Sequence, residues 1–175
     1  MGWEMKFAYA DPPYYKQGKK HYGKLHEEAD KWDEQQAHVD LIDQLIDQYP
    51  DGWAMSCNPA NLHFLLRPEI RVAVWCKTFH QIRPTTVQYA YEPVLFMGGR
   101  KDNKRQPMVR DWLTSSIAMK KGLVGAKPDV FNNWVLDLLN FQFGDTLDDL
   151  FPGTGGMGEV VHRRNAQVGI NYAEL

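Results

Sequence analysis

Two consecutive prolines follow an apolar stretch near the start of the chain, and they limit what this segment can form. Residues 6–10 read KFAYA, which is typical of a short β-strand, and Asp11, Pro12 and Pro13 come next. Proline fixes φ and lacks a backbone N–H, so it cannot continue the hydrogen-bond ladder of a central strand. The sequence therefore predicts a strand over 6–10 that ends in a stiff turn at Asp11.

Strand and helix patterns alternate along the rest of the chain. Apolar residues at helical spacing predict an amphipathic helix over about 33–49. Such alternation indicates an α/β fold with a mostly parallel sheet, helices on both faces and one β-hairpin in the second half. Further helices are expected at 58–66, 112–119, 128–140 and 159–165, and further strands at 52–57, 71–79, 87–99, 146–151 and 166–171, with 71–79 and 87–99 forming the hairpin.

Composition narrows the class of protein. A length of 175 residues suits one domain, and 43% hydrophobic with 24% charged residues is ordinary for a globular chain. The first residues lack the pattern of a secretory signal, and no stretch approaches about 18 consecutive apolar residues, so we expect an intracellular, cytoplasmic protein. Cys57 and Cys76 are too few for a disulfide framework or a zinc cluster, and no metal is expected.

The net charge of −2 conceals segments of opposite sign. Two basic segments, 16–24 and 100–110, could flank a phosphate backbone, whereas an acidic segment between them, 27–51, is expected to face solvent. Solvated loops explain each segment equally well when it is taken singly. The candidate phosphate contacts are Lys16, Lys19, Lys20, Arg100, Lys101, Lys104 and Arg105.

The turn at residues 10–14, ADPPY, carries groups that suit one chemical task. The backbone carbonyls at 11–13 and the Asp11 carboxylate form a rigid set of hydrogen-bond acceptors, and the Tyr14 ring is close in sequence. Such a set can accept two N–H bonds from an aromatic amine and stack on a flat heterocycle. The alternative interpretation is an Asx-type turn in which the acid only caps the backbone.

A glycine-rich turn, FPGTGG at 151–156, follows one predicted strand and precedes a helix. Glycines allow positive φ and let backbone N–H groups approach a ligand closely. In an open parallel sheet, ligands bind beyond the carboxyl ends of strands, where both this turn and the ADPPY turn are expected. Tight packing of strand against helix is the alternative reason for the glycines.

Taken together, ADPPY (10–14), GAKP (125–128) and GDTLDDLFPGTGG (144–156) resemble the S-adenosylmethionine-dependent DNA amino-methyltransferases that modify adenine N6 or cytosine N4. The catalytic motif comes first and the cofactor loop last, as in the permuted β group of that family. VAVWCK (72–77) and YEPVL (91–95) are similar to the family's later strand motifs. The resemblance covers nearly the whole chain and implies one methyltransferase-like (Rossmann-like) domain over 1–175.

The resemblance also implies roles for individual residues. Asp11, Pro12 and Pro13 would form the catalytic turn, with Asp11 and the Pro12 carbonyl holding the target amine of a flipped-out base and Tyr14 stacking on that base. An aspartate at the first motif position favours adenine N6. The implied contacts of the cofactor S-adenosylmethionine are Asp149, Phe151, Gly153, Gly155, Lys127 at the methionine carboxylate and Asn171 at the ribose.

The chain also departs from the family pattern. Asn171 replaces the usual acid, and the edge strand that normally helps to enclose the cofactor adenine is expected to be absent, so a second subunit of a homodimer could complete the pocket. Residues 96–126 form only a small polar insert where relatives carry a recognition domain, a build that would suit a phage enzyme. The open alternatives are a catalytically degenerate nucleic-acid-binding protein, a cytosine N4 methyltransferase, and RNA in place of DNA as substrate.

Overall fold

The computed structural model describes residues 3–15, 29–78, 87–101, 108–118 and 126–172, and for 167–172 it describes the backbone alone. Six strands form one sheet in the order β5-β3-β4-β2-β1-β6. Only β4 runs antiparallel to its neighbours, β2 and β3, while the other pairings are parallel. The strands are β1 (Lys6–Ala10), β2 (Gly52–Ser56), β3 (Arg71–Lys77), β4 (Tyr91–Gly98), β5 (Trp112–Ser115) and β6 (Thr146–Asp149).

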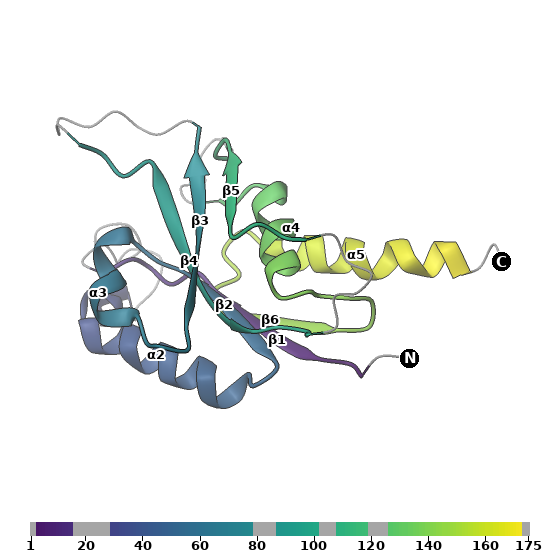
Figure 1. The fold of residues 1–175 in the computed structure, drawn as a ribbon, viewed down its shortest axis with the longest axis horizontal. Coiled ribbons are helices and arrows are strands. Elements are labelled where there is room, and N and C mark those ends of the chain that lie inside the picture. Colours follow the sequence, from purple (N-terminus) through teal and green to yellow (C-terminus); the bar gives the residue numbers. More distant parts are fainter. Residues whose placement is uncertain (1–2, 16–28, 79–86, 102–107, 119–125, 173–175) are drawn as a thin grey trace.

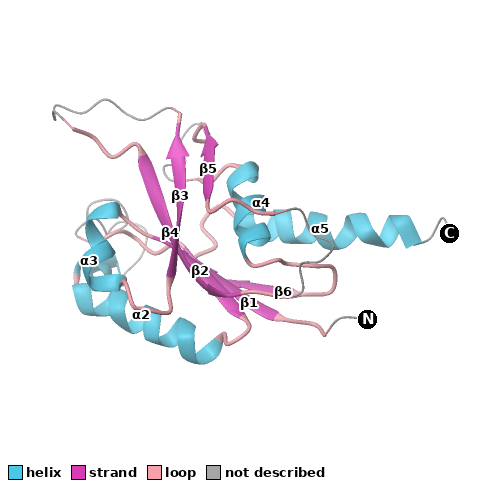
Figure 2. Ribbon diagram, in the orientation of Figure 1, coloured by secondary structure: helices cyan, strands magenta, loops and turns pink. Residues whose placement is uncertain are grey.

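Helices cover both faces of the sheet, as the sequence predicted (Figures 1 and 2). The α2 and α3 helices lie on one side, and α4 and α5 lie on the other. The mostly parallel α/β architecture and the β3–β4 hairpin are therefore confirmed. The helices are the 3₁₀ helices η1 (Ala29–Asp33) and η2 (Pro59–Asn61), and the α-helices α2 (Gln35–Gln48), α3 (Leu62–Leu65), α4 (Asp129–Leu138) and α5 (Gly156–Tyr172).

Alternation along the strands divides the core into two layers. In β1, Phe7 and Tyr9 contribute to the layer under α4 and α5, whereas Ala8 and Ala10 contribute to the layer under α2 and α3. All four residues are buried, as expected for a central strand covered on both faces. The core thus holds β1 rigidly in the middle of the sheet, and the turn that follows it inherits that position.

Two of the secondary-structure elements predicted from the sequence are wrong. Residues 112–115 form the edge strand β5, parallel to β3, instead of a helix over 112–119. Their burial alternates between exposed and half-buried, which suits a strand, and Trp75 Nε1 donates a hydrogen bond to Ser115 Oγ at 2.8 Å. The predicted insert 96–126 therefore contributes a strand to the sheet.

The second wrong prediction is the strand at 166–171. These residues continue α5, which runs from Gly156 to Tyr172 and extends away from the rest of the molecule (Figure 1). No proline or turn sequence separates Asn165 from Ala166, so nothing interrupts the helix there. Within the described part of the chain, β6 is consequently an edge strand. None of the helices described there is long and apolar enough to cross a membrane.

Candidate active site

The sheet brings the two predicted loops together. The β1 and β6 strands are parallel neighbours, with Tyr9 opposite Asp149, and the Leu150 N–H donates to the Tyr9 carbonyl at 2.9 Å. The turn at Asp11 and the glycine-rich loop after Asp149 therefore leave adjacent strands at the same, carboxyl, edge of the sheet. This is the edge at which open α/β sheets bind ligands.

Lys127 links the Asp11 turn to Glu92 in β4 through ion pairs. Its Nζ lies 3.1 and 3.0 Å from the two Asp11 carboxylate oxygens and 2.9 Å from Glu92 Oε1. Glu92 Oε2 in turn accepts a bond from Lys77 Nζ at 2.9 Å. Asp11, Lys127, Glu92 and Lys77 thus form an alternating chain of charges, here called the ion network, across β1, the start of α4, β4 and β3.

The charges in the ion network perturb each other's pKa values. Burial alone would raise the pKa of Glu92, but Lys127 and Lys77 hold it at about 2. Burial would lower the pKa of Lys127, yet Asp11 and Glu92 raise it well above its ordinary value. Burial raises the pKa of Asp11, a rise that Lys127 opposes and Glu92 reinforces. Glu92 and Lys127 thus favour each other's charged form, and the ion pairs hold the side chains of the network in position.

Glu92 is the functional candidate that sequence reasoning missed. It follows Tyr91 at the start of β4, and its side chain is 4% exposed. A lone acid in an otherwise apolar strand was the available signal, because a charged residue is almost never fully buried unless it is paired. The partner, Lys127, is 35 positions away in the sequence, so only the fold reveals the pair.

Two tyrosines border the ion network. Tyr14 is half-buried, with Lys127 Nζ 6.0 Å from its ring centroid, and burial together with Glu92 raises the pKa of Tyr14 well above its ordinary value. Tyr9 is buried beneath the turn, and its hydroxyl is 2.9 Å from Ser56 Oγ. Tyr14 therefore presents a neutral ring at the turn, while Tyr9 supports the turn from below.

The glycine-rich loop adopts the backbone conformation that its sequence predicted. Gly153 and Gly155 have φ values of 49° and 78°, in the region that favours glycine. The Phe151 N–H donates to Asp149 Oδ1 at 3.3 Å, and burial raises the pKa of Asp149. A methyl group added to Gly155 would meet nothing within 4 Å, so the loop backbone borders open space just before α5 begins.

Phe151 packs against a ring that the sequence did not bring forward. Its centroid is 5.0 Å from that of Trp32 in η1, at an edge-to-face angle of 76°. Trp32 also contacts the buried His38, whose Nε2 is 2.9 Å from the Trp32 carbonyl. Trp32 thus forms an aromatic wall beside the loop, on the side of the sheet covered by α2.

Two predicted cofactor contacts, Lys127 and Asn171, lie in surroundings that differ from those their predicted roles require. The structure places Lys127 in ion pairs with Asp11 and Glu92, so a methionine carboxylate would have to share it with two side-chain carboxylates. Asn171 lies in α5 and its side chain is outside the described residues. Since the strand expected to carry Asn171 to the ribose is helical, the structural reason for that contact is lost.

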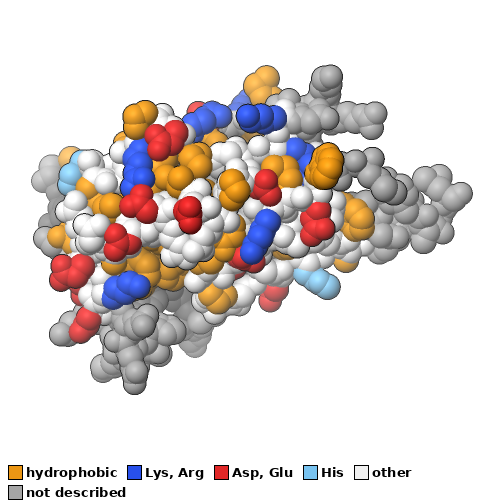
Figure 3. Space-filling model, turned by 90° about the horizontal axis from the view of Figure 1, so that it is seen from below, with side chains coloured by type: hydrophobic (Ala, Val, Ile, Leu, Met, Phe, Trp, Pro, Cys, Tyr) orange, Lys and Arg blue, Asp and Glu red, His pale blue; other side chains and the backbone are white. Residues whose placement is uncertain are grey.

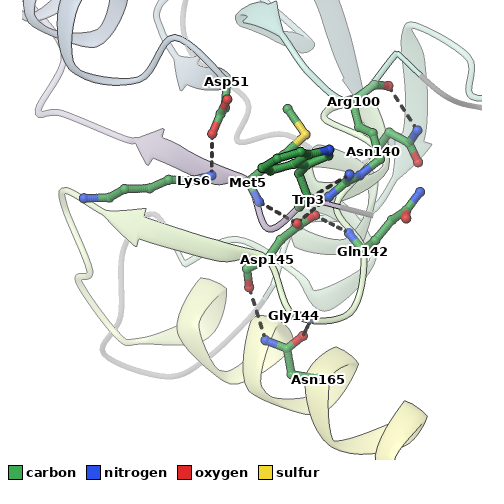
Figure 4. A network of polar contacts seen from close by, with 10 residues as sticks. All are labelled: Trp3, Met5, Lys6, Asp51, Arg100, Asn140, Gln142, Gly144, Asp145 and Asn165. Carbon is green, nitrogen blue, oxygen red and sulfur yellow. Dashed lines mark hydrogen bonds and ion pairs between the residues drawn. The ribbon is translucent and has the colours of Figure 1, made fainter. Parts of the chain in front are cut away.

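Arg100 lies at the amino ends of β1 and β6, on the opposite side of the sheet from the Asp11 turn. This position does not suit its predicted role as a phosphate contact. Its side chain is 12% exposed, pairs with the buried carboxylate of Asp145 and donates to the Trp3 carbonyl (Figure 4). Asp145 precedes β6 and also accepts from the Met5 N–H, so this contact holds the amino ends of the strands together. Among the other candidates, Lys101 is exposed, and Lys16, Lys19, Lys20, Lys104 and Arg105 lie outside the described residues.

The surface drawn in Figure 3 carries both signs of charge. Lysine and arginine side chains are interspersed there with acidic and hydrophobic ones. The described residues on this face therefore give no basis for assigning it to nucleic-acid binding, and the sequence segments rich in lysine remain the candidates.

Comparison with known proteins identifies the fold. No family model matches the chain, and no curated protein matches it. Among solved structures, the complex of M1.HpyAVI with SAM is similar over 91% of this chain and 78% of that one, with 14% identity and a TM-score of 0.57. A Thermus thermophilus protein described as a DNA modification methylase is similar over 93% and 78%, with 14% identity and a TM-score of 0.53. The chain shares the fold of these proteins.

Proposed function

We propose that this chain is an S-adenosylmethionine-dependent DNA methyltransferase that modifies the exocyclic amine of a flipped-out base. One observation carries the proposal: the Asp-Pro-Pro-Tyr turn after β1 and the glycine-rich loop after β6 leave neighbouring parallel strands at one edge of the sheet. That arrangement can hold an amine acceptor beside a methyl donor. The likeness of the fold to the M1.HpyAVI complex and to the Thermus thermophilus protein supports the same class of function.

The residues present fit the cofactor. Gly153 and Gly155 hold the loop in a left-handed conformation beside open space, and the start of α5 directs backbone N–H groups and the positive end of the helix dipole toward that space. Phe151, backed by Trp32, offers an apolar ring to an adenosine. When bound, S-adenosylmethionine would supply a methyl group on a sulfonium sulfur; its transfer would break that S–C bond as the N–C bond to the amine forms, leaving a thioether and releasing one amine proton to solvent.

The Asp11 turn would position that amine. An exocyclic amine is a poor nucleophile because its lone pair is delocalised into the ring. The Asp11 carboxylate and the Pro12 carbonyl can accept its two N–H bonds, which favours a pyramidal nitrogen with its lone pair directed at the methyl group. Lys127 holds both oxygens of Asp11, so the carboxylate is oriented before the base arrives. The neutral ring of Tyr14 would stack on the base.

Adenine N6 is the proposed target, because Asp11 occupies the position at which cytosine N4 enzymes more often carry serine. Extrusion of the base requires a few kcal/mol of unpairing in a duplex and less in a single strand. Expression of the chain in a bacterial host, followed by digestion of host DNA and mass analysis, tests both class and base. N6-methyladenine that disappears with Asp11→Ala supports the proposal. N4-methylcytosine in its place would mean that the target base is cytosine and not adenine. Methyladenine that persists in the variant would refute the role of Asp11.

A catalytically degenerate nucleic-acid-binding protein is the second candidate. It is favoured by the position of β6 at the edge of the described sheet and by the helix at 166–171, where the sequence resemblance implied a second cofactor strand. Titration calorimetry separates the two functions. Binding of S-adenosylmethionine, alone or with DNA, supports the enzyme, and its absence under both conditions supports the degenerate protein.

A further inference from the structure

Asn132, on α4, is a buried polar side chain that the proposed mechanism does not use. It is 1% exposed, and neither its Oδ1 nor its Nδ2 has a hydrogen-bond partner among the described residues. Its backbone N–H, in contrast, is satisfied by the Pro128 carbonyl at 3.1 Å. Buried amides are nearly always paired, so an amide with both atoms unpaired calls for an explanation.

The Asn132 amide faces the start of α5. A methyl group added to Gly156, the first residue of that helix, would lie 3.3 Å from Asn132 Nδ2 and 3.9 Å from Thr154 Oγ1. The amide nitrogen therefore packs closely against the backbone of Gly156, where any side chain would crowd it. The unpaired donor, Nδ2, thus adjoins the positive end of a 17-residue helix.

The charges of the ion network bear on where a ligand carboxylate could bind. Lys127 and Lys77 are already matched by Asp11 and Glu92 in the ion network. An incoming carboxylate would therefore find no uncompensated cation in the network. The start of α5 offers backbone N–H groups, the acid in its first turn, Glu159, is exposed, and the neutral amide of Asn132 lies beside them.

We propose that Asn132 binds the amino-acid end of the cofactor, its Nδ2 donating to the carboxylate and its Oδ1 accepting from the ammonium group. This inference rests on the proposed function, since it assigns a further residue to the same cofactor site. An α-amino acid carries one acceptor group and one donor group on a single carbon, and the primary amide presents the complementary pair. Because the amide is buried in this structure, the proposal requires the loop to move when the ligand binds, and the glycines at 153, 155 and 156 restrict its backbone least.

Asn132→Leu provides the decisive variant, because leucine has the same branched shape and no polar atoms. Removing unpaired polar atoms from the interior leaves the folded state as stable or makes it more stable. Loss of ligand affinity without loss of stability then identifies a binding residue. Asn133→Ala is the matched control on the same helix: Asn133 Oδ1 accepts from Arg164 Nε at 2.9 Å, so this variant should lower stability and leave ligand affinity unchanged.

Calorimetry with two ligands tests the assignment. S-Adenosylhomocysteine has the amino-acid end, and 5′-methylthioadenosine lacks it. We expect Asn132→Leu to weaken binding of S-adenosylhomocysteine at least tenfold and to leave 5′-methylthioadenosine binding unchanged, with an equal or higher urea midpoint. Equal affinity of wild type and variant for S-adenosylhomocysteine overturns the inference alone, and so does an equal loss for both ligands. Failure of the wild type to bind S-adenosylhomocysteine or S-adenosylmethionine, with or without DNA, overturns the proposed function as well.

Discussion

Tyr9 in β1 lies directly opposite Asp149 in β6, in the parallel register of the two strands. The Asp-Pro-Pro-Tyr turn begins two residues after Tyr9, and the glycine-rich loop begins two residues after Asp149. Segments 140 positions apart in the sequence are thereby placed side by side by a single strand pairing. The proposed site depends on this pairing more than on any individual side chain.

Tyr14 should contribute its ring to base binding and not its hydroxyl. Because burial and Glu92 keep the phenol neutral, Tyr14→Phe preserves the stacking surface and should retain kcat/KM within about threefold. Tyr14→Ala removes about 1 to 3 kcal/mol of stacking, which corresponds to roughly 5- to 150-fold in kcat/KM for DNA. Steady-state methylation assays with an oligonucleotide substrate measure both values.

The adjacent tyrosine supplies the control. Tyr15 packs on His38 and Phe64, with centroids 6.3 and 5.8 Å apart, so it supports the α2 side of the fold. Tyr15→Ala should lower the urea midpoint more than Tyr14→Ala does. If Tyr14→Ala instead lost stability and retained kcat/KM, the stacking role would be wrong.

Glu92→Gln should destabilise the protein in a pH-dependent way. The variant leaves Lys127 and Lys77 with Asp11 as their remaining network carboxylate, and breaking such a buried network should lower the free energy of unfolding by about 3 kcal/mol at pH 7. The folded-state pKa of Glu92, about 2, is below its ordinary value of 4.5. Its stabilising contribution is therefore complete above pH 4.5 and is lost as the pH falls toward 2.

Urea unfolding from pH 7 down to pH 2 measures this effect as the difference between wild type and Glu92→Gln. The difference should shrink across the acidic window. Glu69→Gln, at an exposed glutamate, should show little difference at any pH. A wild-type advantage that stayed constant down to pH 2 would contradict the assigned pairing of Glu92.

The sequence was most informative where proline and glycine restrict the backbone. The bounds of β1 were predicted to the residue, because Asp11, Pro12 and Pro13 cannot extend a central strand. The positive φ of Gly153 and Gly155 likewise followed from the loop sequence. Local chemistry decides these features, so they can be recognised without the fold.

Features that depend on tertiary neighbours were not predictable in the same way. Residues 112–115 form a strand because β3 offers them an open edge, and four residues carry too weak a pattern to indicate this in advance. Glu92 is informative only once Lys127 is seen beside it. Arg100 belonged to a basic segment, yet its environment is set by Asp145 at the amino edge of the sheet.

Two glycines in and just after the glycine-rich loop should respond oppositely to alanine. Both Gly155 and Gly158 have open space where a Cβ would go, so steric clash plays no part. Gly155 has φ 78°, and alanine there should cost about 1 to 2 kcal/mol and weaken S-adenosylmethionine binding. Gly158 lies inside α5, and alanine there should add about 1 kcal/mol of stability.

Thermal unfolding and calorimetry on these two variants form a matched test of loop geometry. The contrast reflects backbone conformation and not crowding, because an added Cβ would have no atom within 4 Å at either position. Equal changes in stability for the two variants would show that the loop does not require a left-handed residue at 155.

Arg100 should matter for stability and not for nucleic-acid affinity. Arg100→Leu leaves the buried Asp145 carboxylate without its cation, which should lower the free energy of unfolding by about 3 to 5 kcal/mol. Substitution of a residue that contacts phosphate would instead reduce the slope of log affinity against log salt concentration by about one. Fluorescence anisotropy of a labelled oligonucleotide across a salt series, below the unfolding temperature of the variant, should give the wild-type slope. Lys101→Gln, at the exposed neighbour, should leave stability unchanged, and a reduced slope for Arg100→Leu would restore Arg100 as a phosphate contact.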